Sequence, residues 1–347
     1  MKIRLTALAL LVTAALAPSA SAQSLINGAG ATFPYPIYSK WFDAYTKVDP
    51  EVRFNYQSIG SGGGIKQVTS RTVDFGATDG PMTDEQLKAA PGELVHIPTV
   101  LGAVVATYNL PGNPRLQFAP DVLADIFLGK ITKWNDARLT ASNPGVTLPN
   151  EPIAVVHRSD GSGTTYIWVD YLSKVSPEWQ QKVGKGTSVN WPVGLGGKGN
   201  EGVAGQVKNT PGALGYVELA YAVKNKLPVG LVKNAAGKFI EPTIESTTAA
   251  AAGAAKSMPD DFRVSLTNAP GDAAYPIASF TWLLVYREQP DEAKGRAIVN
   301  FLWWMSHEGQ KYAADLLYAP LPAPVVKQIE AKIKQINYRG KPLLAAR

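Results

Sequence analysis

The sequence predicts an α/β fold, because a short apolar run, a glycine-containing loop and a helical pattern follow one another three times along the chain. The chain has 347 residues, of which 45% are hydrophobic and 18% charged, with 32 glycines, 26 prolines and no cysteine. This composition excludes a disordered chain, a collagen and a disulfide-stabilised scaffold. At about 150 residues per domain, the length predicts two domains.

Residues 1–22 have the pattern of a secretory signal peptide. Lys2 and Arg4 precede the apolar segment Leu5–Ala17, and Ala20-Ser21-Ala22 suits a cleavage site. The alternative, an uncleaved anchor, is disfavoured because the apolar segment is shorter than the roughly 20 residues that span a bilayer. With no cysteine to carry a lipid, we expect a cleaved signal peptide, no membrane anchor and the periplasm as destination.

Three strand-like runs lead into predicted helices through glycine loops that also carry hydroxyl groups. The loops are Gly28–Thr32, Gly60–Gly64 and Arg158–Thr164. Helix N-termini expose N–H groups with partial positive charge, and glycine lets an oxyanion come close to them. One such loop alone is more often a capped helix, but three in one chain predict an anion site.

The helices after these loops are predicted to begin near Thr32 or Phe33, near Ile65 and near Thr165. Two apolar runs suit strands that cross between two lobes, Val95–Tyr108 and Ser279–Tyr286. Further helices are predicted over Thr247–Lys256, Asp291–Met305, Glu308–Leu317 and Pro324–Ile336.

Two charged residues near the loops suit an anion that carries a proton. The Arg158 guanidinium matches phosphate geometry, and Asp160 could hold it in place; the alternative is an ordinary surface ion pair. Asp79 would repel an anion unless the ligand brings a proton, since a carboxylate only accepts hydrogen bonds. By itself Asp79-Gly80-Pro81 is more often a turn.

Catalytic and metal alternatives have weaker signals. His96, His157 and His307 have no metal-ligand spacing and no cysteine partner, so we expect no metal. A secreted serine-dependent phosphate-ester hydrolase would use Ser162 as nucleophile and His157 as base. Asp160, however, stands where the glycine of a nucleophile elbow belongs.

A nucleotide cofactor and nucleic acid are not expected either. Gly194, Gly196 and Gly199 satisfy G-x-G-x-x-G, but the preceding residues are a poor strand and the following ones do not open an obvious helix, so we interpret the segment as a loop. A net charge of +6 is too small to indicate nucleic-acid binding by itself.

Taken together, the three loops and Asp74–Asp79 resemble the periplasmic phosphate-binding proteins of bacterial phosphate ABC importers, with a likeness from about Asn27 to Tyr318. The resemblance implies a two-lobed type II periplasmic-binding-protein clamshell, with a central mixed β-sheet flanked by helices in each lobe and two crossover strands as hinge. One lobe would comprise residues 24–100 plus 275–347, and the other residues 101–274.

The resemblance also implies the ligand set. Phosphate would be bound by Thr32, Phe33, Ser61, Asp79, Arg158, Ser162, Gly163 and Thr164, with Phe33 and Gly163 contributing backbone N–H groups and Asp160 orienting Arg158. The implied function is capture of inorganic phosphate and its delivery to the transmembrane permease subunits of an ABC importer, by a monomer that is not an enzyme and needs no cofactor. Sulfate or molybdate binding is the nearest alternative, and Asp79 is the residue that discriminates.

Overall fold

The computed structural model describes residues 23–254 and 258–344. The predicted signal peptide, the end of the predicted helix 247–256 and the last three residues lie outside the described residues.

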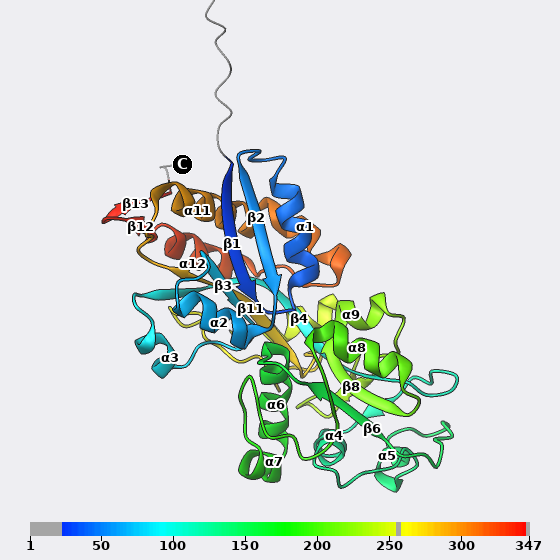
Figure 1. Ribbon diagram of the computed structural model, residues 1–347. Helices are drawn as coiled ribbons and strands as arrows, with labels where there is room; N and C mark the ends of the chain where they lie inside the picture. The colour runs from blue at the N-terminus through cyan, green and yellow to red at the C-terminus, as the bar shows by residue number, and fades with distance from the viewer. Residues whose placement is uncertain (1–22, 255–257, 345–347) are drawn as a thin grey trace, which may run out of the picture.

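An eight-stranded mixed sheet runs through the molecule in the order β2-β1-β3-β11-β4-β8-β6-β7 (Figure 1). The first three strands are parallel to one another, as are the last three, and β11 and β4 run antiparallel to their neighbours. The predicted α/β class is confirmed. The strands are β1 (Ser24–Gly30), β2 (Val52–Ser58), β3 (Phe75–Thr78), β4 (Leu94–Tyr108), β6 (Ala154–Arg158), β7 (Leu195–Gly197), β8 (Ala213–Glu218) and β11 (Ala278–Tyr286).

Strand β4 connects the two halves of this sheet. All of its residues are buried, in keeping with an almost uninterrupted apolar run. Residues up to Ala103 pair with β11, and Val104–Tyr108 pair with β8. The two predicted crossover runs therefore form strands, and the predicted lobe boundary at residue 100 falls inside β4.

Helices cover both halves of the sheet (Figure 1). Around β1, β2 and β3 lie α1 (Tyr35–Tyr45), α2 (Ser61–Thr69), α3 (Asp84–Ala89), α11 (Glu292–Ser306) and α12 (Ala323–Ile333). The residues between β4 and β11 form α4 (Pro120–Phe127), α5 (Ala137–Ala141), α6 (Gly163–Val175), α7 (Pro177–Lys182), α8 (Gly199–Asn209), α9 (Leu219–Lys224) and α10 (Ile244–Ala251). The small strands are β5 (Gln117–Phe118), β9 (Leu231–Lys233), β10 (Phe239–Ile240), β12 (Asn337–Tyr338) and β13 (Lys341–Pro342).

Two helix predictions need correction. In place of one helix over residues 308–317 there are two short 3₁₀-helices, η2 (Glu308–Tyr312) and η3 (Ala314–Leu316). Leu317, in a left-handed conformation with φ of 66°, ends η3. The alanine-rich helix begins at Ile244, earlier than predicted, because Thr243 and Ser246 form a capping box.

An aromatic core lies between the β1–β3 half of the sheet and helices α1 and α11. Phe42 stacks on Phe54 with ring centroids 4.8 Å apart, and Phe301 lies 4.5 Å from Phe54. This packing fixes α1 and therefore the loop that precedes it. Over the described ranges, no helix is both long and apolar enough to cross a bilayer.

Candidate functional site

The predicted glycine loops lie at the carboxyl ends of β1, β2 and β6, and each leads into the N-terminus of a helix. Helix α1 begins at Tyr35, after a turn in which the Tyr35 N–H donates to the Thr32 carbonyl. Helix α6 begins at Gly163, and its N-cap Ser162 accepts from the Thr165 N–H. Strand β6 runs antiparallel to β1 and β2, so direct contacts, and not a shared sheet edge, bring the loops together. The Gly62 N–H of the second loop donates to the Gly161 carbonyl of the third at 2.9 Å.

The second helix begins one turn earlier than predicted. Ser61, and not Ile65, is the first residue of α2, so the glycine run forms helix and not loop. A Cβ on Gly64 would lie 2.6 Å from the Gly30 Cα and 2.7 Å from the Ala77 carbonyl oxygen. The glycines therefore let α2 pack against the strands that carry the site.

The eight predicted ligand residues are all buried. Two groups of contacts join them across the chain. The Asp79 N–H donates to the Ser61 Oγ at 3.2 Å, and a Cβ on Gly163 would lie 2.4 Å from that Oγ and 2.5 Å from the Asp79 Oδ2. Loop residues from both halves of the sheet therefore meet at Gly163, where only glycine fits.

Asn200, which sequence reasoning missed, makes the second group of contacts. Its Nδ2 donates to the Thr32 Oγ1 at 2.7 Å and to the Thr164 Oγ1 at 3.0 Å, and its backbone N–H also reaches the Thr32 Oγ1. Asn200 lies in the first turn of α8. The segment interpreted as a loop is in fact the edge strand β7 followed by α8, and the glycine before Asn200 was the available signal.

Arg158 and Asp160 form a buried, bidentate pair. The Arg158 Nε donates to the Asp160 Oδ1 at 2.8 Å and the Nη2 to the Oδ2 at 2.5 Å, while the Gly199 N–H also donates to Oδ1. The side chains are 1% and 14% exposed, so the alternative of a surface ion pair is wrong. Burial works to raise the pKa of Asp160, but the bonds from Arg158 outweigh it and leave that pKa below its usual value.

The third guanidinium nitrogen of Arg158, Nη1, does not bond to Asp160. This nitrogen is buried and has no hydrogen-bond partner within the described part of the chain. Because a guanidinium only donates hydrogen bonds, Nη1 is a positively charged donor with an unmet need for an acceptor.

Asp79 is 1% exposed and follows strand β3 directly. Burial raises its pKa to about 7, although the bond from Thr281, the charge of Arg158 and the contact with Ser61 work in the opposite direction. The Thr281 Oγ1 donates to the Asp79 Oδ1 at 2.8 Å. Thr281 was not found from the sequence because it lies in β11, about 200 residues away. The site thus contains a carboxyl group that can hold or release a proton near neutral pH.

The residues of the alternative hydrolase do not meet in a hydrogen bond among the described residues. The His157 ring stacks on Trp191 with centroids 4.7 Å apart, and its Nδ1 lies 3.0 Å from the Arg158 carbonyl oxygen. The Ser162 Oγ caps α6. No cluster of three or more potential metal ligands occurs in residues 23–254 and 258–344.

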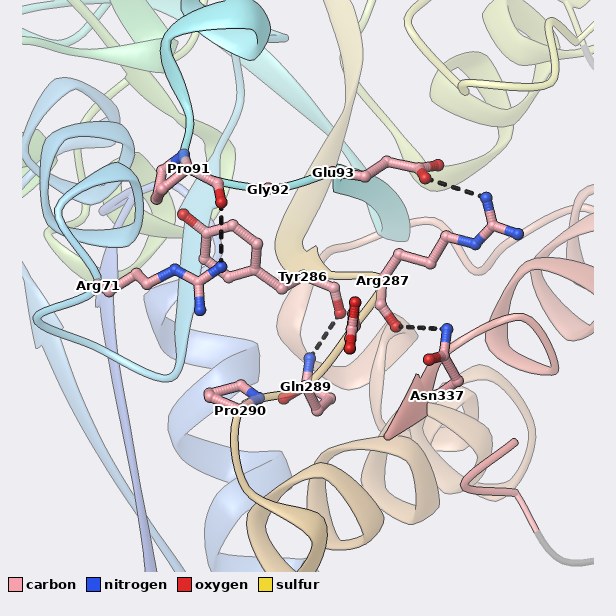
Figure 2. A pocket seen from close by; sticks show the side chains of 10 residues that line it. Arg71, Pro91, Gly92, Glu93, Tyr286, Arg287, Gln289, Pro290 and Asn337 are labelled. Atoms are coloured by element: carbon pink, nitrogen blue, oxygen red, sulfur yellow. Dashed lines mark hydrogen bonds and ion pairs between the residues drawn. The ribbon is translucent and has the colours of Figure 1, made fainter. Parts of the chain in front are cut away.

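An open surface pocket of about 540 Å³ lies elsewhere and contains none of the predicted ligand residues. Figure 2 shows its two arginines occupied by neighbours: Arg71 donates to the Pro91 carbonyl, and Arg287 pairs with Glu93 at 2.9 Å. The Arg71 guanidinium also lies over the Tyr286 ring, 4.3 Å from its centroid. The buried loop cluster, and not this pocket, is the candidate site.

Comparisons with known proteins identify the family of this chain. Residues 17–308 match the model of the PBP superfamily domain. The chain is 50% identical to the phosphate-binding protein PstS of Xylella fastidiosa strain 9a5c over 310 residues, 88% of this chain and 84% of that protein. It is 48% identical to the phosphate-binding protein PstS of Haemophilus influenzae over 91% of this chain and 94% of that protein. A solved phosphate-binding protein from Stenotrophomonas maltophilia, 20% identical, superposes with a TM-score of 0.69 over 89% of this chain and 94% of that one.

Proposed function

We propose that this chain, which belongs to the PstS family of phosphate-binding proteins, captures inorganic phosphate between two lobes and delivers it to the permease subunits of an ABC importer. It works as a monomer in the periplasm, after export with a cleaved signal peptide, and breaks no bond. The lobes are residues 24–100 plus 275–347 and residues 101–274.

The observation that carries the proposal is the mixture of groups that converge at one buried place. Helix N-termini, hydroxyls and the free Arg158 Nη1 supply donors and positive potential. Beside them stands Asp79, a carboxyl group that accepts. A ligand that satisfies both must have several acceptor oxygens and at least one proton to donate, and this description fits phosphate at neutral pH.

The proposed ligand groups are those that the family resemblance implies, and their burial at one place supports them. Thr32, Ser61, Ser162 and Thr164 contribute hydroxyls, Phe33 and Gly163 contribute backbone N–H groups, and Arg158 contributes Nη1. Asp79 accepts the ligand's proton, and Asp160 orients Arg158 through its two bonds. Ser162 can serve because its Oγ uses only a lone pair to cap α6 and keeps its own proton to donate.

Closure is supported by contacts between residues assigned to different lobes. The Gly62 N–H donates to the Gly161 carbonyl at 2.9 Å, and the Tyr221 hydroxyl donates to the Thr32 carbonyl at 2.5 Å. The Arg263 Nη1 donates to the Met82 carbonyl at 2.9 Å. Because the proposed ligand residues are all buried as well, a ligand held among them would be shielded from solvent.

Equilibrium titration calorimetry with phosphate, sulfate and molybdate, at neutral pH and fixed salt, tests the proposal. We expect phosphate to bind and excess sulfate or molybdate to displace it only weakly. Equal affinity for the three would make this a general oxyanion binder. Absence of phosphate binding, together with turnover of a chromogenic phosphate ester that Ser162→Ala abolishes, would instead support the hydrolase.

A further inference from the structure

Glu218 is a fully buried carboxyl group that the proposed ligand set does not use. It ends β8 and serves as the N-cap of α9, where its Oε2 accepts from the Ala220 N–H at 2.9 Å. Its residue is 0% exposed, and its Oε1 has no hydrogen-bond partner among the described residues. Such a group needs a physical explanation, because a buried carboxylate with an unpaired oxygen is costly.

The contacts of Tyr318 bear on the protonation state of Glu218. The Tyr318 hydroxyl is 2.6 Å from the Phe33 carbonyl oxygen and 3.2 Å from the Glu218 Oε2. A carbonyl oxygen only accepts, so the single proton of the Tyr318 hydroxyl is used on Phe33. The second contact is then a hydrogen bond only if Glu218 supplies the proton.

The charges around Glu218 favour the same protonation state. It forms no ion pair with Lys, Arg or His within the residues that the structure describes. The charge acting on it from the site is Asp79, which has the same sign, and burial raises the pKa of Glu218 well above its usual value. Tyr221, on the helix α9 that Glu218 caps, also interacts electrostatically with Glu218, and burial raises the pKa of that phenol, so it adds no positive charge.

Phe33 connects this group to the anion site. The Tyr318 hydroxyl holds the Phe33 carbonyl, and the Tyr221 hydroxyl holds the Thr32 carbonyl. The Thr32 carbonyl and the Phe33 N–H belong to one planar peptide group, and the Phe33 carbonyl belongs to the next. Holding both carbonyls therefore restrains the backbone of Phe33 on both sides of its Cα and, with it, the direction of its N–H. Donation to the Thr32 carbonyl also polarises the peptide and strengthens the N–H as a donor.

We propose that Glu218 is a neutral carboxylic acid at pH 7 and a positioning residue for the anion site. Its proton is donated to Tyr318, Tyr318 donates to the Phe33 carbonyl, and the Phe33 N–H is thereby aimed at the ligand. The last link rests on the proposed phosphate-binding function, whereas the protonation state of Glu218 does not.

Carbon-13 NMR of protein labelled at the glutamate side-chain carboxyl tests the protonation state. We expect one resonance at the position of a neutral acid that does not titrate between pH 5 and 8. It disappears in Glu218→Gln and persists in Glu245→Gln, an exposed glutamate in the first turn of α10. A spectrum in which every glutamate titrates with an ordinary pKa overturns the proposal, as does a neutral-acid signal that survives Glu218→Gln.

Tyr318→Phe provides a second test that does not require the Glu218 variant to fold. Removing the hydroxyl must shift the neutral-acid resonance of Glu218 and the nitrogen-15 resonance of the Phe33 amide, whereas Glu245→Gln must shift neither. Unchanged resonances in Tyr318→Phe contradict the chain of hydrogen bonds.

Phosphate titrations test whether this series of hydrogen bonds affects phosphate binding. In Glu218→Gln, no single atom of the new side-chain amide can both accept from Ala220 and donate to Tyr318. This variant and Tyr318→Phe should therefore each weaken phosphate binding by about two- to tenfold. The double variant should be no weaker than the worse single one; additive losses contradict a shared path. If the wild-type protein binds no phosphate, the proposed function fails while the carboxyl spectrum still decides the state of Glu218.

Discussion

Burial and hydrogen bonding act on Asp79 in opposite directions, and burial dominates. The carboxyl group accepts from Thr281 and feels the charge of Arg158, yet its pKa rises to about 7. The physical reason is that desolvation penalises the charged form of an acid. Asp79 is thus suited to a ligand that brings a proton, and two predictions follow at this residue.

Asp79 should set the selectivity for phosphate over sulfate. Sulfate has no proton, so in a closed cleft it would face an ionised Asp79 lone pair to lone pair, at a cost of about 3–5 kcal/mol, or roughly 10²–10⁴ in affinity. This penalty should apply in full only well above the Asp79 pKa of about 7, so the selectivity for phosphate should grow as the pH rises through 7. Asp79→Asn should narrow the gap between phosphate and sulfate, because an amide can turn its NH₂ toward an unprotonated oxygen. Competition titrations on both proteins measure this, and equal rejection of sulfate would place the discrimination elsewhere.

Asp79 should also make the stability of the protein depend on pH. Because the pKa of Asp79 is raised from 3.8 to about 7 in the folded protein, its contribution to stability is fully present below pH 4 and is lost as the pH rises through 7. In phosphate-free buffer, the free energy of unfolding of the wild type should therefore fall over this window relative to Asp79→Asn. Urea unfolding of both proteins at several pH values measures this difference in the free energy of unfolding. The control is Asp272→Asn, because the Asp272 side chain is 76% exposed. Its free energy of unfolding should depend on pH as that of the wild type does. If Asp79→Asn showed the same pH dependence as the wild type, the raised pKa of Asp79 would be contradicted.

Arg158 is the proposed ligand with a formal positive charge. Arg158→Met removes that charge but keeps the helix N-termini and hydroxyls, so phosphate binding should weaken and not vanish. A charge-assisted hydrogen bond contributes about 1.5–3 kcal/mol, which corresponds to roughly ten- to two-hundred-fold in Kd. Arg115→Met, at an exposed ion pair, is the control. An unchanged Kd would remove Arg158 from the site.

At the scale of elements, the site depends on how closely α6 approaches α2 and β3. The first residue of α6 is Gly163, and the space for a Cβ there is already occupied by the Ser61 Oγ and by the Asp79 Oδ2 and Cβ. The hydroxyl could rotate, but the Asp79 Cβ, 2.6 Å away, belongs to the strand end and cannot. The closed arrangement therefore requires glycine at this helix start.

Gly163→Ala should accordingly fold but bind phosphate far more weakly, because the added methyl group prevents the approach of α6 to β3. The matched control is Gly205→Ala in α8, where a Cβ would meet no atom within 4 Å; it should bind normally and gain slightly in stability. Calorimetry and thermal unfolding separate the two effects. Wild-type affinity in Gly163→Ala would show that the site does not close in this way.

At the scale of the whole molecule, β4 and β11 run side by side through the middle of the sheet (Figure 1). The segment at Ala319 pairs with β4, since Leu101 and Ala319 exchange two backbone hydrogen bonds of 3.0 and 2.9 Å. Bending of these segments near Val100 and Ser279 would separate the loops of one half from those of the other.

Phosphate should therefore reduce the radius of gyration in small-angle X-ray scattering, because only a ligand with higher affinity for the closed state can shift the lobes toward it. Gly163→Ala should show no such reduction, since its closed state is blocked. The same radius for the wild-type protein with and without phosphate would argue against hinge closure.

The local sequence determined the fold class, the crossover strands and the three loops that end in helix N-termini. These features depend on short-range signals: apolar runs, glycines beside hydroxyl residues, and helical periodicity. The same signals failed at Leu195–Asn200, because β7 is a short edge strand stabilised by its pairing with β6 and not by its own side chains.

Only the tertiary structure decided how these loops are held. Asn200, Thr281, Tyr221, Glu218 and Tyr318 come from elements far along the chain, and each carries an ordinary local pattern. Their importance arises from burial, which makes an unpaired polar group costly and so forces each one onto a specific partner. The raised pKa of Asp79 and the proton that we assign to Glu218 have the same origin: a sequence specifies the acid, but the surrounding protein sets the free energy of its charge.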